Sequence, residues 1–142
     1  MSVTDLTLSL KDLQAEAKSL SLKVLPPCCI LLWGDMGAGK TTFSKAFISA
    51  LLKNKNTEIP SPTFTLVQTY STAKGEIWHS DLYRISHPEE ILELDLLEAM
   101  RTCICLIEWP DRLQHYLPER RIDIHLGIIN ENYRSLRIES KL

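Results

Sequence analysis

The 142-residue sequence has no long hydrophobic run and no excess of positive charge. Its longest apolar runs, CCILLW and CICLI, are far shorter than the ~20 residues that span a bilayer. The first twenty residues carry acids early and contain no continuous apolar stretch, so we expect no signal peptide. Lysine and arginine total 16 and aspartate and glutamate 18, and the net charge of −2 provides no overall basic field to attract nucleic acid. These absences predict a cytoplasmic protein that binds neither a membrane nor DNA.

The chain contains four cysteines, Cys28, Cys29, Cys103 and Cys105. A zinc site built from the two pairs is one interpretation. However, both pairs lie inside apolar, strand-like runs, and their spacing is not the one that zinc ligands usually show. Reduced thiols buried in the core are the favoured interpretation.

Apolar patterning predicts alternating strands and helices in one domain over residues 1–142, because no repeat or linker interrupts the chain. The continuous apolar runs at 28–33 and 103–109 are typical of strands buried on both faces of a parallel sheet. The other expected elements are a strand at 6–10, helices at 11–20, 41–52 and 87–100, and hairpin strands at 63–70, 75–83, 121–129 and 134–140. This order predicts an α/β fold with a mixed sheet.

Residues 34–41, GDMGAGKT, fit the phosphate-binding pattern G-x-x-x-x-G-K-[ST] at every fixed position. Glycines let backbone N–H groups converge on phosphate oxygens, and the N-terminus of the next helix adds positive potential. The Lys40 ammonium would reach the β- and γ-phosphates, the Thr41 hydroxyl would ligate Mg²⁺, and Thr42 would contact the α-phosphate. Chance produces this pattern in about one chain of this length in a few hundred. Because a buried strand precedes it and an amphipathic helix follows, we expect a nucleotide site.

The segment after this loop should bury one helix face, formed by Phe43, Ala46, Phe47, Ala50 and Leu51. A polar, proline-punctuated loop should follow at 53–62. Within it, NKNT is the string nearest to the guanine-reading pattern Asn-Lys-x-Asp, but threonine replaces the aspartate. We therefore do not expect specificity for GTP.

Phosphoryl transfer also needs a second Mg²⁺ anchor and a group that orients the attacking water. Glu108 ends the apolar strand CICLI, at the edge where open α/β sheets bind ligands, and is a candidate for the anchor. Asp81 ends another strand and could approach the metal or polarise water. His79, two residues earlier, should face the same side, although a single histidine is more often structural. Ser61 and Thr63 either sense the γ-phosphate as a switch segment does or form an ordinary turn.

The combined motifs resemble the bacterial TsaE family, small P-loop ATPases of tRNA threonylcarbamoyladenosine (t6A) biosynthesis. The strings GDMGAGKTTF, SPTFTLV, HSDLYRI with PEE, and CICLIEWPDR stand in the order and spacing of that family, and the resemblance runs from about residue 5 to residue 139. It implies a P-loop NTPase-like three-layer fold with a mixed, mainly parallel central sheet and antiparallel hairpins.

The resemblance also implies roles for individual residues. Thr41 and Glu108 would hold Mg²⁺, Asp81 would assist hydrolysis together with Lys40, and Ser61 and Thr63 would lie in a switch-like segment. Residues that would contact ATP are Met36, Gly37, Ala38, Gly39, Lys40, Thr41, Thr42 and, in the turn before the last strand, Arg134. The segment from Thr7 to Leu10 would border the adenine, and Trp109 would either pack locally or touch the nucleotide. Met36 replaces the leucine usual in the family, a mild apolar change.

Family members act with two partner proteins, TsaB and TsaD, to place a threonylcarbamoyl group on adenosine 37 of tRNAs that read ANN codons. The resemblance assigns the transfer itself to TsaD, so this chain would contact tRNA only through the complex. The local basic cluster PERR (118–121) is interpreted as a solvated strand end. Two other functions stay open: a freestanding P-loop kinase of a small metabolite, and a nucleotide-binding module without turnover.

Overall fold

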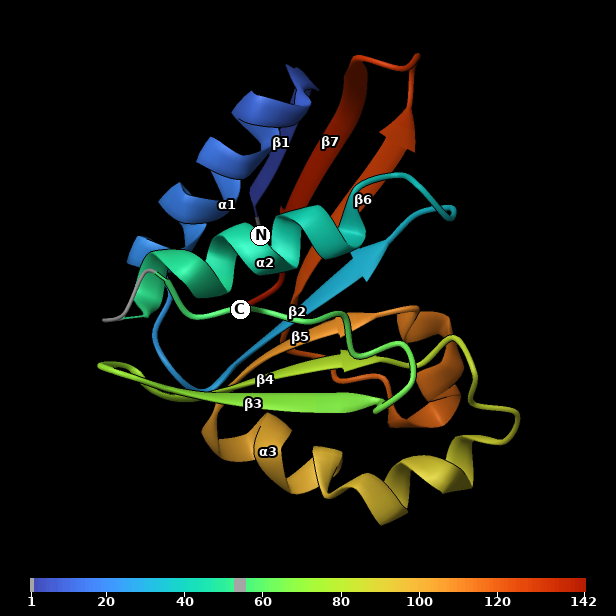
Figure 1. The fold of residues 1–142 in the computed structure, drawn as a ribbon. Coiled ribbons are helices and arrows are strands. Elements are labelled where there is room, and N and C mark those ends of the chain that lie inside the picture. Colours follow the sequence, from blue (N-terminus) through green and yellow to red (C-terminus); the bar gives the residue numbers. More distant parts are fainter. Residues whose placement is uncertain (1, 53–55) are drawn as a thin grey trace.

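The computed structural model describes residues 2–52 and 56–142. Within these residues the chain forms one seven-stranded sheet with helices packed on both faces (Figure 1). The elements are β1 (Ser2–Ser9), α1 (Leu10–Lys23), β2 (Cys28–Trp33), α2 (Lys40–Leu51), β3 (Val67–Thr72), β4 (Gly75–Asp81), the 3₁₀ helix η1 (Pro88–Leu94), α3 (Leu96–Thr102), β5 (Ile104–Glu108), the 3₁₀ helix η2 (Pro110–Tyr116), β6 (Ile122–Ile128) and β7 (Tyr133–Ser140).

The sheet has the strand order β1-β7-β6-β2-β5-β4-β3. Its middle is parallel, because β2 pairs in parallel with both β5 and β6, and β5 pairs in parallel with β4. Its margins are antiparallel hairpins and pairs, β3 with β4 on one side and β7 with β6 and β1 on the other. The predicted α/β fold with a mixed sheet and antiparallel hairpins is confirmed, and the sheet is parallel in its middle rather than in most of its pairs, since three of the six strand pairs in the described residues are antiparallel.

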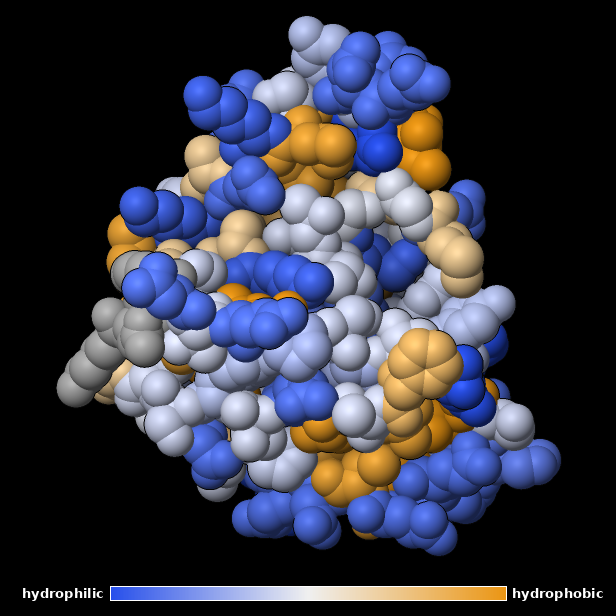
Figure 2. Space-filling view, in the orientation of Figure 1, coloured by the Kyte–Doolittle hydropathy of each residue, from blue (hydrophilic) through white to orange (hydrophobic). Residues whose placement is uncertain are grey.

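Two hydrophobic cores lie on opposite faces of the sheet. One packs α1 and α2 against the strands and contains the fully buried Leu13, Phe43 and Phe47. The other lies under η1, α3 and η2 and contains Leu31 and Ile107. Figure 1 shows α1 and α2 on one side of the sheet and α3 on the other, which gives three layers. In Figure 2, apolar side chains gather below β3, where the second helical layer meets the sheet.

The strands that read as continuous apolar runs were predicted almost to the residue. The structure has β2 at Cys28–Trp33 and β5 at Ile104–Glu108. In α2, Phe43 and Phe47 are buried as expected, while the predicted Ala46, Ala50 and Leu51 are only partly buried. The loop expected at 53–62 and the NKNT string lie partly outside the described residues, since 53–55 are not described.

The single helix predicted at 87–100 is wrong. Asp95 adopts a left-handed conformation, with φ of 59°, and divides the segment into η1 and α3. The division lets two differently directed apolar faces pack on one sheet surface, since Ile91 from η1 and Leu96 from α3 are both fully buried in the same core. Amphipathic spacing alone does not reveal such a break.

The strand predicted at 63–70 starts later, at Val67. Residues 62–66 form a turn, in which the Leu66 N–H donates to the Pro62 carbonyl over 2.7 Å. Leu66 has a positive φ of 69°, which ends the extended conformation there. This turn brings Thr63 beside β4 instead of continuing the edge strand.

All four cysteines are free thiols. Cys28, Cys29 and Cys105 are buried, as predicted for reduced core residues, and Cys103 is partly exposed. Burial raises the pKa of the Cys28 thiol to about 11. Among the described residues, no helix combines the length and the hydropathy that a transmembrane segment needs.

Candidate nucleotide-binding site

The glycine-rich loop connects the C-terminal end of β2 to the N-terminus of α2. Gly39 precedes the helix with a φ of 110°, in the region where L side chains are strained. Gly34, at the start of the loop, has a φ of +152°, and a Cβ there would lie 2.5 Å from the Leu126 backbone oxygen. The loop therefore needs glycine both for its turn and for its close approach to β6.

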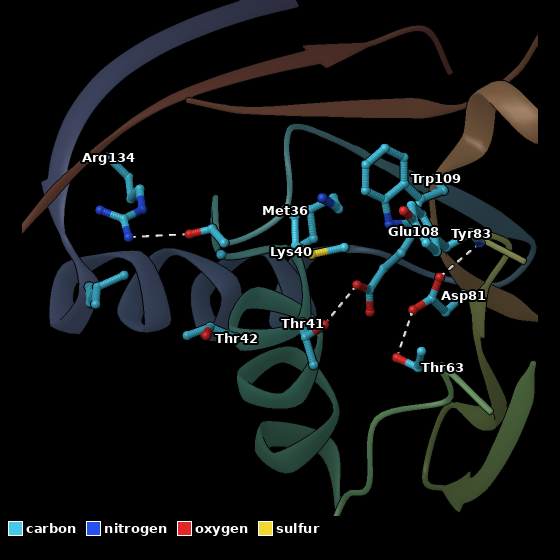
Figure 3. A pocket seen from close by; sticks show the side chains of 13 residues that line it. Met36, Lys40, Thr41, Thr42, Thr63, Asp81, Tyr83, Glu108, Trp109 and Arg134 are labelled. Carbon is cyan, nitrogen blue, oxygen red and sulfur yellow. Dashed lines mark hydrogen bonds between the residues drawn. The ribbon is translucent and has the colours of Figure 1, made fainter. Parts of the chain in front are cut away.

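A pocket of ≈ 460 Å³ opens beside this loop, at the carboxyl ends of β2, β4 and β5. Its lining comes from the loop, α2, the strand ends and both chain-terminal regions. The lining residues are Leu10, Met36, Gly37, Gly39, Lys40, Thr41, Thr42, Thr63, Asp81, Tyr83, Glu108, Trp109 and Arg134. Figure 3 shows Thr41, Glu108 and Asp81 converging from α2, β5 and β4. Of the residues predicted to bind the phosphates or the metal or to take part in catalysis, all except Ala38 line this pocket. Ser61 and Thr7, which were also predicted to lie near the nucleotide, do not.

Ala38 is the exception. Its side chain is fully buried in the core under α1 and α2. Its N–H donates to the Asp35 carbonyl over 3.0 Å. In this structure Ala38 shapes the loop from behind and does not face the pocket.

Glu108 is buried, with 2% of its surface exposed, and both of its carboxylate oxygens have a hydrogen-bond partner. Its Oε1 accepts a hydrogen bond from the Thr41 hydroxyl at 2.8 Å. Its Oε2 lies 2.6 Å from Nε2 of His79, a residue that is completely buried. The parallel pairing of β4 with β5, which sets Asp81 opposite Glu108, brings these groups together.

Asp81 anchors the turn at 62–66. Its Oδ2 accepts a hydrogen bond from the Thr63 hydroxyl at 3.0 Å, and its Oδ1 accepts one from the Tyr83 N–H at 3.0 Å. The Ser61 and Thr63 hydroxyls are themselves 2.8 Å apart. Ser61, Thr63 and Asp81 thus form one hydrogen-bonded chain at the pocket, but Ser61 is not part of the lining.

The Lys40 ammonium is partly enclosed by its own loop. It donates to the carbonyls of Gly34 and Asp35, the latter over 2.9 Å, and lies 4.2 Å from the centroid of the Trp109 ring. Burial lowers the pKa of Lys40 below its usual range, and the charges of Glu108 and Asp81 offset part of this effect. A cation in such a site is poised for a strongly anionic ligand, which would satisfy it better than carbonyls do.

Comparison with known proteins agrees with this geometry. The family model described as "Threonylcarbamoyl adenosine biosynthesis protein TsaE" matches residues 7–136. This chain belongs to the TsaE family. The protein named tRNA threonylcarbamoyladenosine biosynthesis protein TsaE in Rickettsia felis is 44% identical over 118 residues, which cover 83% of this chain and 68% of that protein. The Bacillus subtilis protein of the same name is 32% identical, over 92% of this chain and 80% of its own length.

A solved structure shows the same fold. The crystal structure of Bacillus subtilis YdiB superimposes with a TM-score of 0.73 at 26% identity, covering 100% of this chain and 89% of that one. Because the alignment covers the whole chain, the likeness in fold includes the sheet and the helices on both of its faces.

Arg134 lines the pocket of this TsaE-family chain from β7. It is the second residue of that strand and not part of the preceding turn, because the strand predicted at 134–140 begins one residue earlier, at Tyr133. Its guanidinium donates to the carbonyls of Asn130 and Tyr133 at 2.7 and 3.0 Å, and to the Gly37 carbonyl at 3.2 Å. Arg134 thus braces the β6–β7 turn against the glycine-rich loop, on the pocket wall opposite Glu108 (Figure 3).

Three further observations resolve or extend the sequence-based expectations for the TsaE-family site. Of the segment from Thr7 to Leu10, Leu10 lines the pocket, whereas Thr7 lies in a separate shallow groove. Trp109 has a φ of 58° and stands 4.9 Å from the Tyr83 ring, so it packs locally and also lines the pocket. Sequence reasoning missed the contact between His79 and Glu108. The alternation of the strand placed His79 on the side of Asp81 but could not identify its neighbour.

Proposed function

We propose that this chain binds ATP with Mg²⁺ in the pocket beside the glycine-rich loop, hydrolyses it, and thereby serves t6A formation on tRNA. The observation that carries the proposal is the cluster of Thr41, Glu108 and Asp81 around one cavity next to Lys40. Phosphoryl transfer to water needs these parts together: an anion cradle, a metal anchor and a water-orienting carboxylate.

The residues present fit a magnesium ion. The Thr41 hydroxyl and the Glu108 carboxylate supply hard oxygen donors at the mouth of the loop, which is the donor chemistry that Mg²⁺ prefers. Thr41 and Glu108 would hold the ion, and when bound it would offset negative charge on the β- and γ-phosphate oxygens.

The remaining pocket residues divide the work on ATP. Backbone amides of residues 36, 37 and 39–42 and the N-terminus of α2 would bind the phosphates, with Thr42 beside the α-phosphate. Lys40 would exchange its carbonyl partners for phosphate oxygens. Asp81 lines the same space and would orient the attacking water. Leu10 and Arg134 would border the far end of the nucleotide.

The role in tRNA modification is supported by family membership and by the names of the relatives. We propose that the chain acts in the cytoplasm with TsaB and TsaD on adenosine 37 of tRNAs that read ANN codons, and that hydrolysis drives or resets their complex. A net charge of −2 agrees with tRNA being bound mainly by the partners.

The test is the t6A content of tRNA from bacteria depleted of their own TsaE and complemented with this chain or its variants. Wild type is expected to restore t6A, Lys40→Ala and Glu108→Ala are expected to fail, and Lys45→Ala on the same helix serves as the matched control. If Glu108→Ala restores t6A while Lys40→Ala does not, nucleotide binding is needed but turnover is not, and the nucleotide-binding module is favoured. If both variants restore t6A, the proposed use of ATP is wrong. If wild type leaves t6A low but the purified protein phosphorylates a metabolite, the kinase is favoured.

A further inference from the structure

His79 lies behind the pocket rather than in it. It belongs to β4, two residues before Asp81, and its side chain is 0% exposed. It does not line the pocket. A group that is fully enclosed by the core cannot touch ATP or water in the pocket, so any part that it plays must pass through a neighbour.

That neighbour is Glu108. The 2.6 Å contact between His79 Nε2 and Glu108 Oε2 occupies one carboxylate oxygen, while Thr41 occupies the other at 2.8 Å. The two partners come from different elements, β4 and α2. With one oxygen held from each side, the carboxylate plane of Glu108 has a fixed direction before any ligand arrives.

We propose that His79 is a positioning residue that holds the Glu108 carboxylate toward Thr41 and thereby sets the affinity of the ATP-bound site for Mg²⁺. This inference rests on the proposed function, because it takes Glu108 as the metal anchor. Partners of metal-ligating carboxylates commonly change metal affinity 10- to 100-fold when they are removed.

The chemistry of the imidazole specifies the hydrogen bond. Nδ1 of His79 is buried and has no hydrogen-bond partner among the described residues. A carboxylate oxygen can only accept, so Nε2 must carry the proton that is donated to Glu108. The donor atom, Nε2, therefore lies at the end of the imidazole ring farthest from the backbone. The side-chain amide nitrogen of Gln extends to about this position, whereas that of Asn is too short to reach it.

Without this donor, Glu108 would keep only the Thr41 hydrogen bond. The carboxylate would be free to turn toward Lys40, whose pKa already responds to its charge. A Glu108 paired with Lys40 would direct both groups away from the nucleotide. The loss should therefore appear mainly in Mg²⁺ affinity and only weakly in ATP binding without metal.

The experiment compares His79→Gln, His79→Asn and His79→Leu in the full chain, with thermal unfolding measured for each. ATP binding is followed by calorimetry in EDTA and across a Mg²⁺ titration. We expect the Mg²⁺ concentration for half-maximal effect to rise roughly 10- to 100-fold in His79→Leu and His79→Asn and to stay within about threefold of wild type in His79→Gln. ATP affinity in EDTA should change little in all three.

A folded His79→Leu or His79→Asn with the Mg²⁺ requirement of wild type would overturn the inference, as would a His79→Gln as impaired as His79→Asn. If His79→Leu fails to fold, the Gln and Asn pair decides alone. If wild-type protein binds no ATP, the proposed function has failed. Long-range ¹H–¹⁵N spectra of the free protein then still test the contact itself, because they must show a proton on Nε2 of His79 whose shift moves in Glu108→Gln.

Discussion

The Thr41 hydroxyl donates a hydrogen bond to Glu108 Oε1 over 2.8 Å, although the two residues are 67 positions apart in the chain. Thr41 stands in the first turn of α2, and Glu108 is the last residue of β5. β2 links the two elements: it pairs directly with β5, and the loop that follows it leads to Thr41. This single contact therefore reports whether helix, loop and strand are correctly assembled.

Two substitutions of Thr41 distinguish the contribution of its hydroxyl from that of its methyl group. We expect Thr41→Ala to weaken Mg²⁺-dependent ATP binding at least tenfold, about 1.4 kcal/mol or more, because it removes the proposed metal donor and a partner of Glu108. Thr41→Ser keeps the hydroxyl and should remain within about threefold of wild type. Calorimetric titration with ATP in Mg²⁺ measures both variants, and a serine variant as weak as alanine would assign the effect to the methyl group.

Removing the Thr63 hydroxyl should loosen the turn at 62–66. Thr63→Val keeps the shape of the side chain but deletes its hydrogen bond to Asp81. Because hydrogen bonds to charged groups contribute about 1.5–3 kcal/mol, amide exchange in residues 63–66 should speed up roughly tenfold or more. Exchange followed by mass spectrometry checks this. Thr65→Val is the control, since its hydroxyl bonds Gln68 instead, and equal acceleration in both variants would count against an anchoring role of Asp81.

Alanine should be tolerated very differently at two glycines with positive φ. At Gly34 a Cβ would lie 2.5 Å from the Leu126 backbone oxygen, whereas at Gly75 no atom comes within 4 Å. Gly75→Ala should therefore cost only the conformational strain, about 1–2 kcal/mol. Gly34→Ala must also displace β6 and should cost clearly more. Urea unfolding of the two variants gives the comparison, and similar losses would mean that β6 yields easily.

Asp123 should make folding stability depend on acid pH. Burial raises the pKa of its carboxyl, but the Trp33 indole and the Arg121 guanidinium more than offset this, so the pKa is lowered in the folded chain. The stabilisation is then fully present above the ordinary aspartate pKa of about 3.9 and is lost as the pH falls through the lower folded value.

Asp123→Asn should therefore be less stable than wild type at pH 7, and the difference should shrink as the pH is lowered below about 4. Denaturant unfolding at a series of pH values measures it. Glu131→Gln, an exposed acid in the turn between β6 and β7, controls for the lost charge. A difference that is constant with pH would show that the carboxylate is not what Arg121 and Trp33 stabilise.

The parts of the fold that the sequence predicts well are those with an unbroken local signal. The apolar runs of β2 and β5 have no other favourable environment than a sheet covered on both faces, and the loop between β2 and α2 follows a fixed residue pattern. The break at Asp95 and the turn at Leu66 have no such signal, because each is a left-handed residue imposed by packing around it.

The sequence was enough to identify which residues would lie at the candidate site, but not which of them would contact one another. Patterns along the chain identified Lys40, Thr41, Asp81 and Glu108, and the structure places all four at one pocket. The register of β4 against β5 is set by long-range pairing, so the link from His79 to Glu108 could not be inferred from spacing. Arg134, which the resemblance placed in the turn before the last strand, lies in that strand, since β7 begins at Tyr133.

The strand order also bears on how the protein comes into being. During translation β2 is made first, then β3 and β4, and only afterwards β5, which must insert between β2 and β4 in the sheet. When β4 has emerged from the ribosome, the growing chain already contains the glycine-rich loop, Thr41 and Asp81. It still lacks β5, the strand that ends in Glu108. Under the function proposed above, the site should become complete only when β5, β6 and β7 have all joined the sheet, because Glu108 ends β5, Gly34 packs against Leu126 of β6, and Arg134 of β7 donates to the Gly37 carbonyl. We therefore expect a nascent or truncated chain that ends before β5 to bind ATP poorly and to hydrolyse none.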